Sequence, residues 1–222
     1  MAAAGPVGRR RSRVTWDDYA EAWSGLHGGF DPRRASPVVR GWVLTAYTVG
    51  VWLGRRRVSP MTVTTIGLLV CVAVPFAARG SLLLAAFLIL VAAAADGLDG
   101  AVAVITDRVT KIGFVYDSVA DRIGELAWLA AFWVAGAPGW LVTAAGAASW
   151  LHEYVRARAS AAGMSEIGVV TVGERPTRAL IAGLGLVLIT VIDRPWLPVA
   201  LWLALQFAGL AQLSVAVRRA LR

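Results

Sequence analysis

The stretch ADGLDGAVAVITDRVTKIGFVYDSVAD, residues 95–121, joins two long apolar segments and carries acidic residues on either side of the join. Four of these acids form two pairs: Asp96 with Asp99, and Asp117 with Asp121. Spacings of three and four residues put the two members of each pair on one face of a helix. The connection between the segments is short, so the two faces can meet. The stretch therefore predicts two neighbouring helices whose four carboxylates converge.

The composition of the whole chain sets the environment of these acids. Of the 222 residues, 58% are hydrophobic and 16% are charged. This composition is too apolar for an ordinary soluble domain of this length and indicates one membrane domain. The lone Cys71 lies in an apolar run and is expected to be a packing residue. The basic N-terminus lacks a short apolar stretch with a cleavage site, so no signal peptide is expected.

Six segments are long enough to cross a hydrocarbon layer of about 30 Å as helices. The predicted spans are residues 60–78, 81–105, 112–136, 139–162, 176–193 and 195–217. Three of them have a proline near the start, where its missing N–H costs least. The tight connections at 79–80 and 136–139 make neighbouring helices antiparallel. The sequence thus predicts an all-α, polytopic membrane protein with six transmembrane helices.

The segments before and after the spans are expected to lie outside the bilayer core. Residues 1–34 are predicted to be a basic tail that could hold a short surface helix. Residues 35–57 are apolar but contain Arg40 and Gly41 and end in three arginines. This pattern favours an amphipathic interfacial helix over a full span. Residues 35–217 then form the membrane domain, and residues 218–222 a basic C-terminal tail.

The basic residues predict the orientation in the membrane. All 22 Lys and Arg residues except Arg79 and Arg194 fall on one side of the predicted layout. Such residues accumulate on the cytoplasmic side of membrane proteins. Both termini and the four aspartates are therefore predicted at the cytoplasmic face of the cell membrane. The basic charge is explained by the membrane, and no nucleic-acid partner is predicted.

The four carboxylates need positive partners in this setting. A charged Asp at the centre of a bilayer costs about 2.5–3.5 kcal/mol, and the nearby bases are only Arg108, Lys111 and Arg122. Two divalent cations, Mg²⁺ or Mn²⁺, would balance four negative charges, and hard cations prefer carboxylate oxygens. The predicted metal ligands are Asp96, Asp99, Asp117 and Asp121. Two alternatives stay open: acids that only cap helices or face water, and a cation or proton path in a transporter.

Glycines accompany both acidic pairs. Gly97 and Gly100 stand beside the first pair, and Gly113 lies one turn before Asp117. Glycine allows another group to approach the backbone, or allows close helix packing. A two-metal site with such access suits a diphosphate, because metals can bridge its oxygens and stabilise charge on a leaving group.

These residues resemble the signature of the CDP-alcohol phosphotransferases, which are integral membrane enzymes of phospholipid synthesis. The residues that match, with the spacing of the family, are Asp96, Asp99, Gly100, Ala103, Gly113, Asp117 and Asp121. Residues 59–67, SPMTVTTIG, resemble the family's opening of the first span. The resemblance covers residues 35–217. It implies six spans after an interfacial helix, and a homodimer.

The resemblance also implies a reaction. A phosphatidyl group would move from a CDP-linked lipid, CDP-diacylglycerol, to a polar alcohol, and CMP would leave. Asp121 would act as the general base that takes the proton of the alcohol hydroxyl. The residues implied to lie near the CDP-lipid are Gly100, Thr110, Thr62, Thr64 and Gly113.

Two positions depart from the family pattern. Val104 stands where the family keeps an arginine, and Met61 where it keeps an asparagine. An arginine could grip a phosphate with two hydrogen bonds, and Arg108 or Lys111 could replace it. The departure leaves open an unusual donor or a non-catalytic member of the family.

The acceptor is suggested by residues 154–181, which carry arginines on the predicted cytoplasmic side. These charges could serve only to orient the chain in the membrane, or they could bind an anionic acceptor. The stretch resembles the matching region of bacterial phosphatidylinositol phosphate synthases, which use inositol phosphate; glycerol phosphate is the alternative acceptor. The arginines implied to contact the acceptor phosphate are Arg156, Arg175 and Arg178. For His152 and Glu153 a structural role is expected.

Overall fold

The computed structural model describes residues 14–26, 29–164 and 171–222. This part of the chain is helical and contains no strand. The helices are α1 (Trp16–Leu26), η1 (Pro32–Arg34, a 3₁₀ helix), α2 (Pro37–Arg55), α3 (Pro60–Ala78), α4 (Leu82–Ile105), α5 (Lys111–Val134), α6 (Gly139–Ala161), α7 (Arg175–Ile192) and α8 (Trp196–Ala220).

The six predicted spans all form helices, with bounds within three residues of the prediction. α8 extends into the predicted C-terminal tail, where Arg218 and Arg219 lie in its last turn. Basic side chains at that end interact favourably with the helix dipole, which accounts for the extension. Within the predicted tail of residues 1–34, a helix forms as α1. Residues 1–13 of the predicted basic tail lie outside the described residues.

Local sequence explains where several helices begin. A hydroxyl at the cap of α2, α3, α4 and α5 accepts a hydrogen bond from the backbone N–H three residues later. The capping residues are Ser36, Ser59, Ser81 and Thr110. Pro37 and Pro60 follow the caps of α2 and α3, where proline is best tolerated. The starts of α4 and α5, the two helices that carry the acidic pairs, are therefore encoded locally.

The core lies among α3–α8. Its largest fully buried side chains include Trp128, Phe132 and Trp202. The indole N–H of Trp202 donates a hydrogen bond of 2.8 Å to the hydroxyl of Ser149, which satisfies the one polar atom of that ring. α4 packs against both α3 and α7. The helix that carries the first acidic pair is thus held centrally in the bundle.

Within the described residues, four helices are long and apolar enough to cross a membrane: α3, α4, α7 and α8. The chain is therefore a membrane protein. α5 and α6 have 24 and 23 residues but are more polar. Their charged residues gather toward one end of each helix, at 111–125 in α5 and 153–158 in α6.

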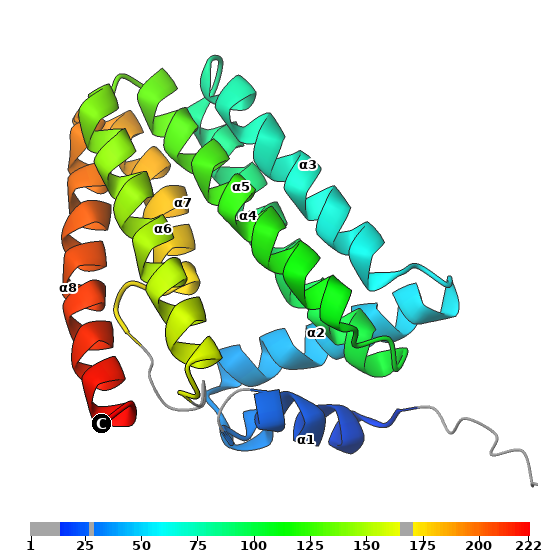
Figure 1. Cartoon of the computed structure of the whole chain (residues 1–222). Coiled ribbons are helices and arrows are strands. Elements are labelled where there is room, and N and C mark those ends of the chain that lie inside the picture. The colour runs from blue at the N-terminus through cyan, green and yellow to red at the C-terminus, as the bar shows by residue number, and fades with distance from the viewer. Residues whose placement is uncertain (1–13, 27–28, 165–170) are drawn as a thin grey trace, which may run out of the picture.

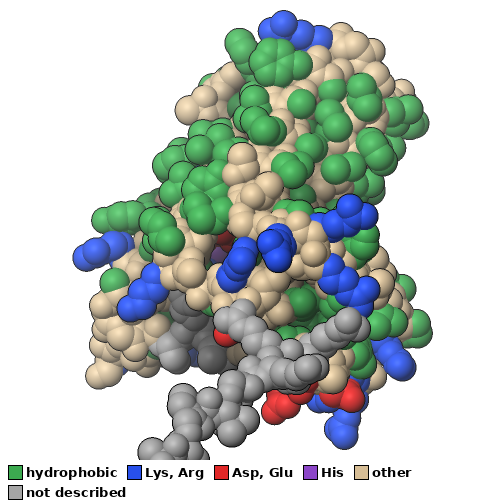
Figure 2. All heavy atoms as spheres, turned by 90° about the vertical axis from the view of Figure 1, so that its right-hand side faces the viewer, with side chains coloured by type: hydrophobic (Ala, Val, Ile, Leu, Met, Phe, Trp, Pro, Cys, Tyr) green, Lys and Arg blue, Asp and Glu red, His purple; other side chains and the backbone are tan. Residues whose placement is uncertain are grey.

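α2 differs in direction from the other long helices. It lies across the lower end of the bundle in Figure 1, at a steep angle to α3–α8, and the C-terminus lies at this same end. Figure 2 shows hydrophobic side chains over the upper part of one face, with Lys and Arg side chains in a band below them. Trp42 and Trp52 of α2 are exposed. Aromatic and basic side chains at this level are typical of a membrane interface.

α1 docks on α2 and on the end of α4 through a small apolar cluster. Tyr19, Val43, Ala46 and Ala101 are buried in it. The hydroxyl of Tyr47 donates to the backbone carbonyl of Val14 at 3.0 Å. Burial raises the pKa of Tyr19 to about 12, so its hydroxyl stays protonated at ordinary pH.

Val104 packs against this cluster. The position at which the family pattern has an arginine therefore contributes an apolar side chain to the docking of α1. The departure from the pattern has a structural consequence: a charged residue at this position would face the same apolar cluster, which includes Tyr19.

Candidate active site

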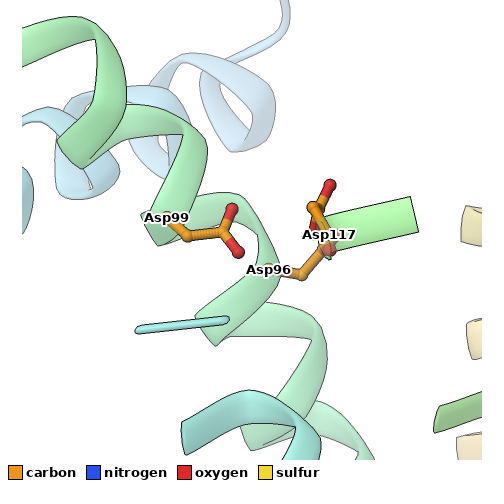
Figure 3. A group of neighbouring side chains, drawn as sticks. All are labelled: Asp96, Asp99 and Asp117. Atoms are coloured by element: carbon orange, nitrogen blue, oxygen red, sulfur yellow. The ribbon is translucent and has the colours of Figure 1, made fainter. Parts of the chain in front are cut away.

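Three of the four aspartates converge in space. One carboxylate oxygen from each of Asp96, Asp99 and Asp117 lies within 4.8 Å of the other two. Figure 3 shows Asp96 and Asp99 on one helix, with Asp117 reaching them from another. The three-residue spacing puts the first pair on one face of α4. The short 106–110 connection leads into α5, and α3 packs against both α4 and α5. This arrangement is the one that the sequence predicts for these three residues.

Asp121 lines the same cavity as the three and forms an ion pair with an arginine. Its Oδ1 forms an ion pair of 2.8 Å with Nη2 of Arg175, the first residue of α7. The same guanidinium forms an ion pair with Asp96, and it lies 5.7 Å above the ring of Trp128, a cation–π distance. Arg175 thus joins both acidic pairs.

All four aspartates and Arg175 line one small cavity of about 20 Å³. This volume is on the order of that needed for a single water or a small ion. Thr64 of α3 also lines the cavity, and its hydroxyl donates a hydrogen bond of 2.6 Å to Oδ2 of Asp99. Both residues are buried, so this bond fixes the direction of the Asp99 carboxylate.

Asp117 provides a test of whether a cation fits. Its Oδ1 is buried and has no hydrogen-bond partner within the described part of the chain. Buried polar atoms in folded proteins normally have a partner. A hard divalent cation binds carboxylate oxygens and would supply one. The three converging carboxylates therefore fit a divalent cation.

The five residues implied for the CDP-lipid divide into two groups. Thr64 and Gly100 lie at the aspartates: Thr64 bonds to Asp99, and a Cβ added to Gly100 would meet no atom within 4 Å. The others stabilise helix starts. Thr62 lies 2.8 Å from the hydroxyl of Ser59, and Thr110 accepts a hydrogen bond from the N–H of Gly113.

The three arginines implied for the acceptor all pair with carboxylates. Arg175 reaches the aspartates, as described above. Arg178 is fully buried and pairs with Glu125 at 3.0 Å and with Glu153. Arg156 pairs with Glu174, just before α7. Only Arg175 of the three lines the cavity.

A buried ion-pair network beneath the aspartates was not predicted. Arg122 pairs with Glu125 at 3.0 Å and with Glu153 at 3.4 Å, and Arg178 joins the same two acids. The sequence holds two signals for it. Glu125 continues the four-residue spacing of Asp117 and Asp121 along α5, and Arg122 lies three residues before Glu125 on the same helix. Arg178 comes from α7 and has no comparable signal.

Comparison with known proteins identifies the class. The model of the CDP-alcohol phosphatidyltransferase family matches residues 57–210, which include the four aspartates, and the chain belongs to this family. It is therefore an enzyme of the class that transfers a phosphatidyl group to an alcohol, as the resemblance implied.

The names of similar proteins are more specific than the name of the family. A phosphatidylinositol phosphate synthase of Corynebacterium glutamicum is 36% identical over 189 residues, which cover 80% of each chain. An archaetidylinositol phosphate synthase of Pyrococcus horikoshii is 32% identical over 61% of this chain and 74% of its own length.

Solved structures of a relative show the same fold. The phosphatidylinositol phosphate synthase of Mycobacterium tuberculosis with CDP-DAG bound has a TM-score of 0.62 and 27% identity, covering 78% of this chain and 92% of that chain. Its complex with manganese and citrate has a TM-score of 0.63 and 25% identity, covering 79% and 88%. A divalent cation is thus present in a structural relative.

Proposed function

We propose that this enzyme transfers the phosphatidyl group of CDP-diacylglycerol to a hydroxyl of inositol phosphate and releases CMP. The convergence of Asp96, Asp99 and Asp117 within 4.8 Å, at the family's motif positions, carries this proposal. The phosphatidylinositol phosphate synthases among the relatives favour inositol phosphate over glycerol phosphate as the acceptor.

Two divalent cations, Mg²⁺ or Mn²⁺, are the proposed cofactors. Their proposed ligands are Asp96, Asp99, Asp117 and Asp121. The unpaired buried oxygen of Asp117 and the charge of the four carboxylates support this assignment. When bound, such cations would stabilise negative charge on the diphosphate and on the departing CMP.

Asp121 is the proposed general base. It lies one turn beyond Asp117 on α5, and the ion pair with Arg175 fixes one of its oxygens. In the proposed step, Asp121 accepts the proton of the acceptor hydroxyl as that oxygen bonds to the lipid-side phosphorus. The bond from this phosphorus to the bridging oxygen breaks, and CMP leaves with the electron pair.

Arg175 is the best candidate for contact with the acceptor phosphate. It lines the cavity, whereas Arg178 is fully buried against two acids and Arg156 is held by Glu174. A guanidinium can bind a phosphate with two parallel hydrogen bonds. On the donor side, Thr64 would orient Asp99, and the open space at Gly100 would admit the nucleotide.

The proposed membrane placement has α3–α8 as six spans, α2 along the cytoplasmic interface and both termini in the cytoplasm. α5 and α6 are each about 35 Å long at 1.5 Å per residue, enough to cross the hydrocarbon layer. Their charged ends lie where α2 crosses the bundle, so the polar residues stay near the interface. A homodimer in the cell membrane is expected from the resemblance.

The test is release of CMP by the purified full-length protein in lipid vesicles. CDP-diacylglycerol is supplied with inositol phosphate, glycerol phosphate or inositol, with and without Mg²⁺ or Mn²⁺. Release is expected to be fastest with inositol phosphate and a divalent cation, and it should be lost in Asp121→Asn. Asp107→Asn is the matched control, because Asp107 is exposed and is not one of the matched residues of the motif. Absence of CMP release with every acceptor would overturn the proposal.

A further inference from the structure

The segment at residues 171–174 leads directly into Arg175 and is bound by α8. The N–H of Val172 donates a hydrogen bond of 2.9 Å to Oε1 of Gln212. The side-chain amide of Gln206 donates one of 3.1 Å to the carbonyl oxygen of Gly173. Gln206 is buried, so this bond is shielded from water.

α6 binds the same segment from another side. Nε2 of His152 lies 2.9 Å from the hydroxyl of Thr171, and both residues are buried. The hydroxyl and the N–H of Thr171 each lie 3.0 Å from Oε1 of Glu174 and donate to it. Because that hydroxyl donates to the carboxylate, it accepts from His152, which places the ring proton on Nε2.

Two glycines bring α8 against the backbone of this segment. A Cβ added to Gly209 would lie 2.8 Å from the backbone N of Gly173 and 2.9 Å from its Cα. Those atoms belong to the backbone, so they cannot rotate away as a flexible side chain can. Any residue other than glycine at position 209 would therefore push the segment away from α8.

Such a shift would reach the aspartates. Gly173 is two residues before Arg175, which begins α7 and forms ion pairs with Asp96 and Asp121. Displacing the backbone at Gly173 moves the base of the Arg175 side chain. The position of the guanidinium over the cavity thus depends on contacts made at α6 and α8.

We propose that His152, Gln206, Gly209 and Gln212 form a positioning clamp that sets the place of Arg175 at the aspartates. The residues of this clamp are positioning residues, because they act through Arg175 and not on the substrates. The proposal rests on the proposed function, in which Arg175 contacts the acceptor phosphate.

Hydrogen–deuterium exchange of the full-length protein in nanodiscs tests the clamp without any turnover. Gly209→Ala is expected to speed exchange of the Val172 N–H at least tenfold. Gly183→Ala is the control, because a Cβ there would only make an ordinary contact of 3.9 Å with Ile89. Gln212→Leu removes the acceptor of the Val172 N–H without added crowding and should give the same result if Gly209→Ala fails to fold. Unchanged exchange overturns the proposal.

Kinetics then test the link to Arg175. In Gly209→Ala, kcat/KM for the acceptor is expected to fall about ten- to a hundredfold, the scale of a misplaced contact near 1 Å. KM for CDP-diacylglycerol should stay within twofold of the wild-type value. In an Arg175→Lys background, Gly209→Ala should lower kcat/KM for the acceptor by less than a further threefold, since both changes act on one contact.

The outcomes separate the two proposals. An equal loss from Gly209→Ala in both backgrounds would overturn the clamp, as it would show an effect independent of Arg175. If Arg175→Lys behaves as the wild type, the acceptor role of Arg175 fails instead. If the wild type releases no CMP, the proposed function fails, and hydrogen–deuterium exchange still decides whether the clamp holds the segment.

Discussion

Removal of Arg178 should be the most destabilising single change to the ion-pair network. Its side chain is fully buried between Glu125, which is also buried, and Glu153. In Arg178→Met, the two acids would share Arg122, at 3.0 Å and 3.4 Å, as their remaining arginine partner. A methionine fills similar space but cannot balance the charge, so a net negative charge remains in the core.

The expected cost is about 3–5 kcal/mol, the usual effect of breaking a buried ion pair from one side. For a chain of 222 residues, this loss corresponds to a fall in Tm of roughly 6–20 °C. Arg158→Met is the matched control, because Arg158 lies on α6 with its side chain exposed. Its Tm should stay within about 2 °C of the wild type, as exposed charges contribute little.

The double variant Arg178→Met, Glu125→Met tests the explanation. It removes one charge of each sign and leaves Arg122 paired with Glu153. Replacing both members of a buried pair by apolar residues is often neutral. The double variant should therefore recover most of the stability lost in Arg178→Met, measured by thermal unfolding in one detergent. If it is no more stable than the single variant, the charge-based reasoning is wrong.

Two further changes probe the aspartates and the N-terminal helix. Thr64→Val removes the hydrogen bond to Asp99 and should weaken Mn²⁺ binding about 10- to 100-fold, as for other residues that orient metal ligands; an unchanged Mn²⁺ titration would contradict this. Val104→Arg restores the family residue but puts a charge into the cluster around Tyr19. Limited proteolysis within residues 14–26 should then become at least several-fold faster; protection equal to the wild type would show that α1 does not depend on position 104.

The parts of the fold that follow from local sequence could be predicted. Serine and threonine caps and the prolines after them mark the helix starts, and apolar length marks the long helices. The convergence of Asp96, Asp99 and Asp117 follows from their spacing and the short connection between α4 and α5. These features depend mainly on residues close in sequence, although the packing of α3 against both α4 and α5 completes the convergence of the aspartates.

The remaining features depend on contacts between distant segments. Arg175 meets Asp96 and Asp121 because α7 packs against α4, and no spacing in the sequence predicts that contact. Arg178 is 53 residues from Glu125, so their pairing appears only in the folded chain. Val104 shows the same limit: its difference from the family pattern is visible in the sequence, but its contact with the α1 cluster is not.

Metal-dependent catalysis at the aspartates is tested most directly by CMP release from CDP-diacylglycerol by wild-type protein and Asp121→Asn, each with Mn²⁺ and with excess EDTA. We expect release by the wild type with inositol phosphate and Mn²⁺, and none after chelation or in Asp121→Asn. The proposed role of the aspartates would be contradicted if Asp121→Asn or the chelated protein released CMP at the rate of the wild type with Mn²⁺.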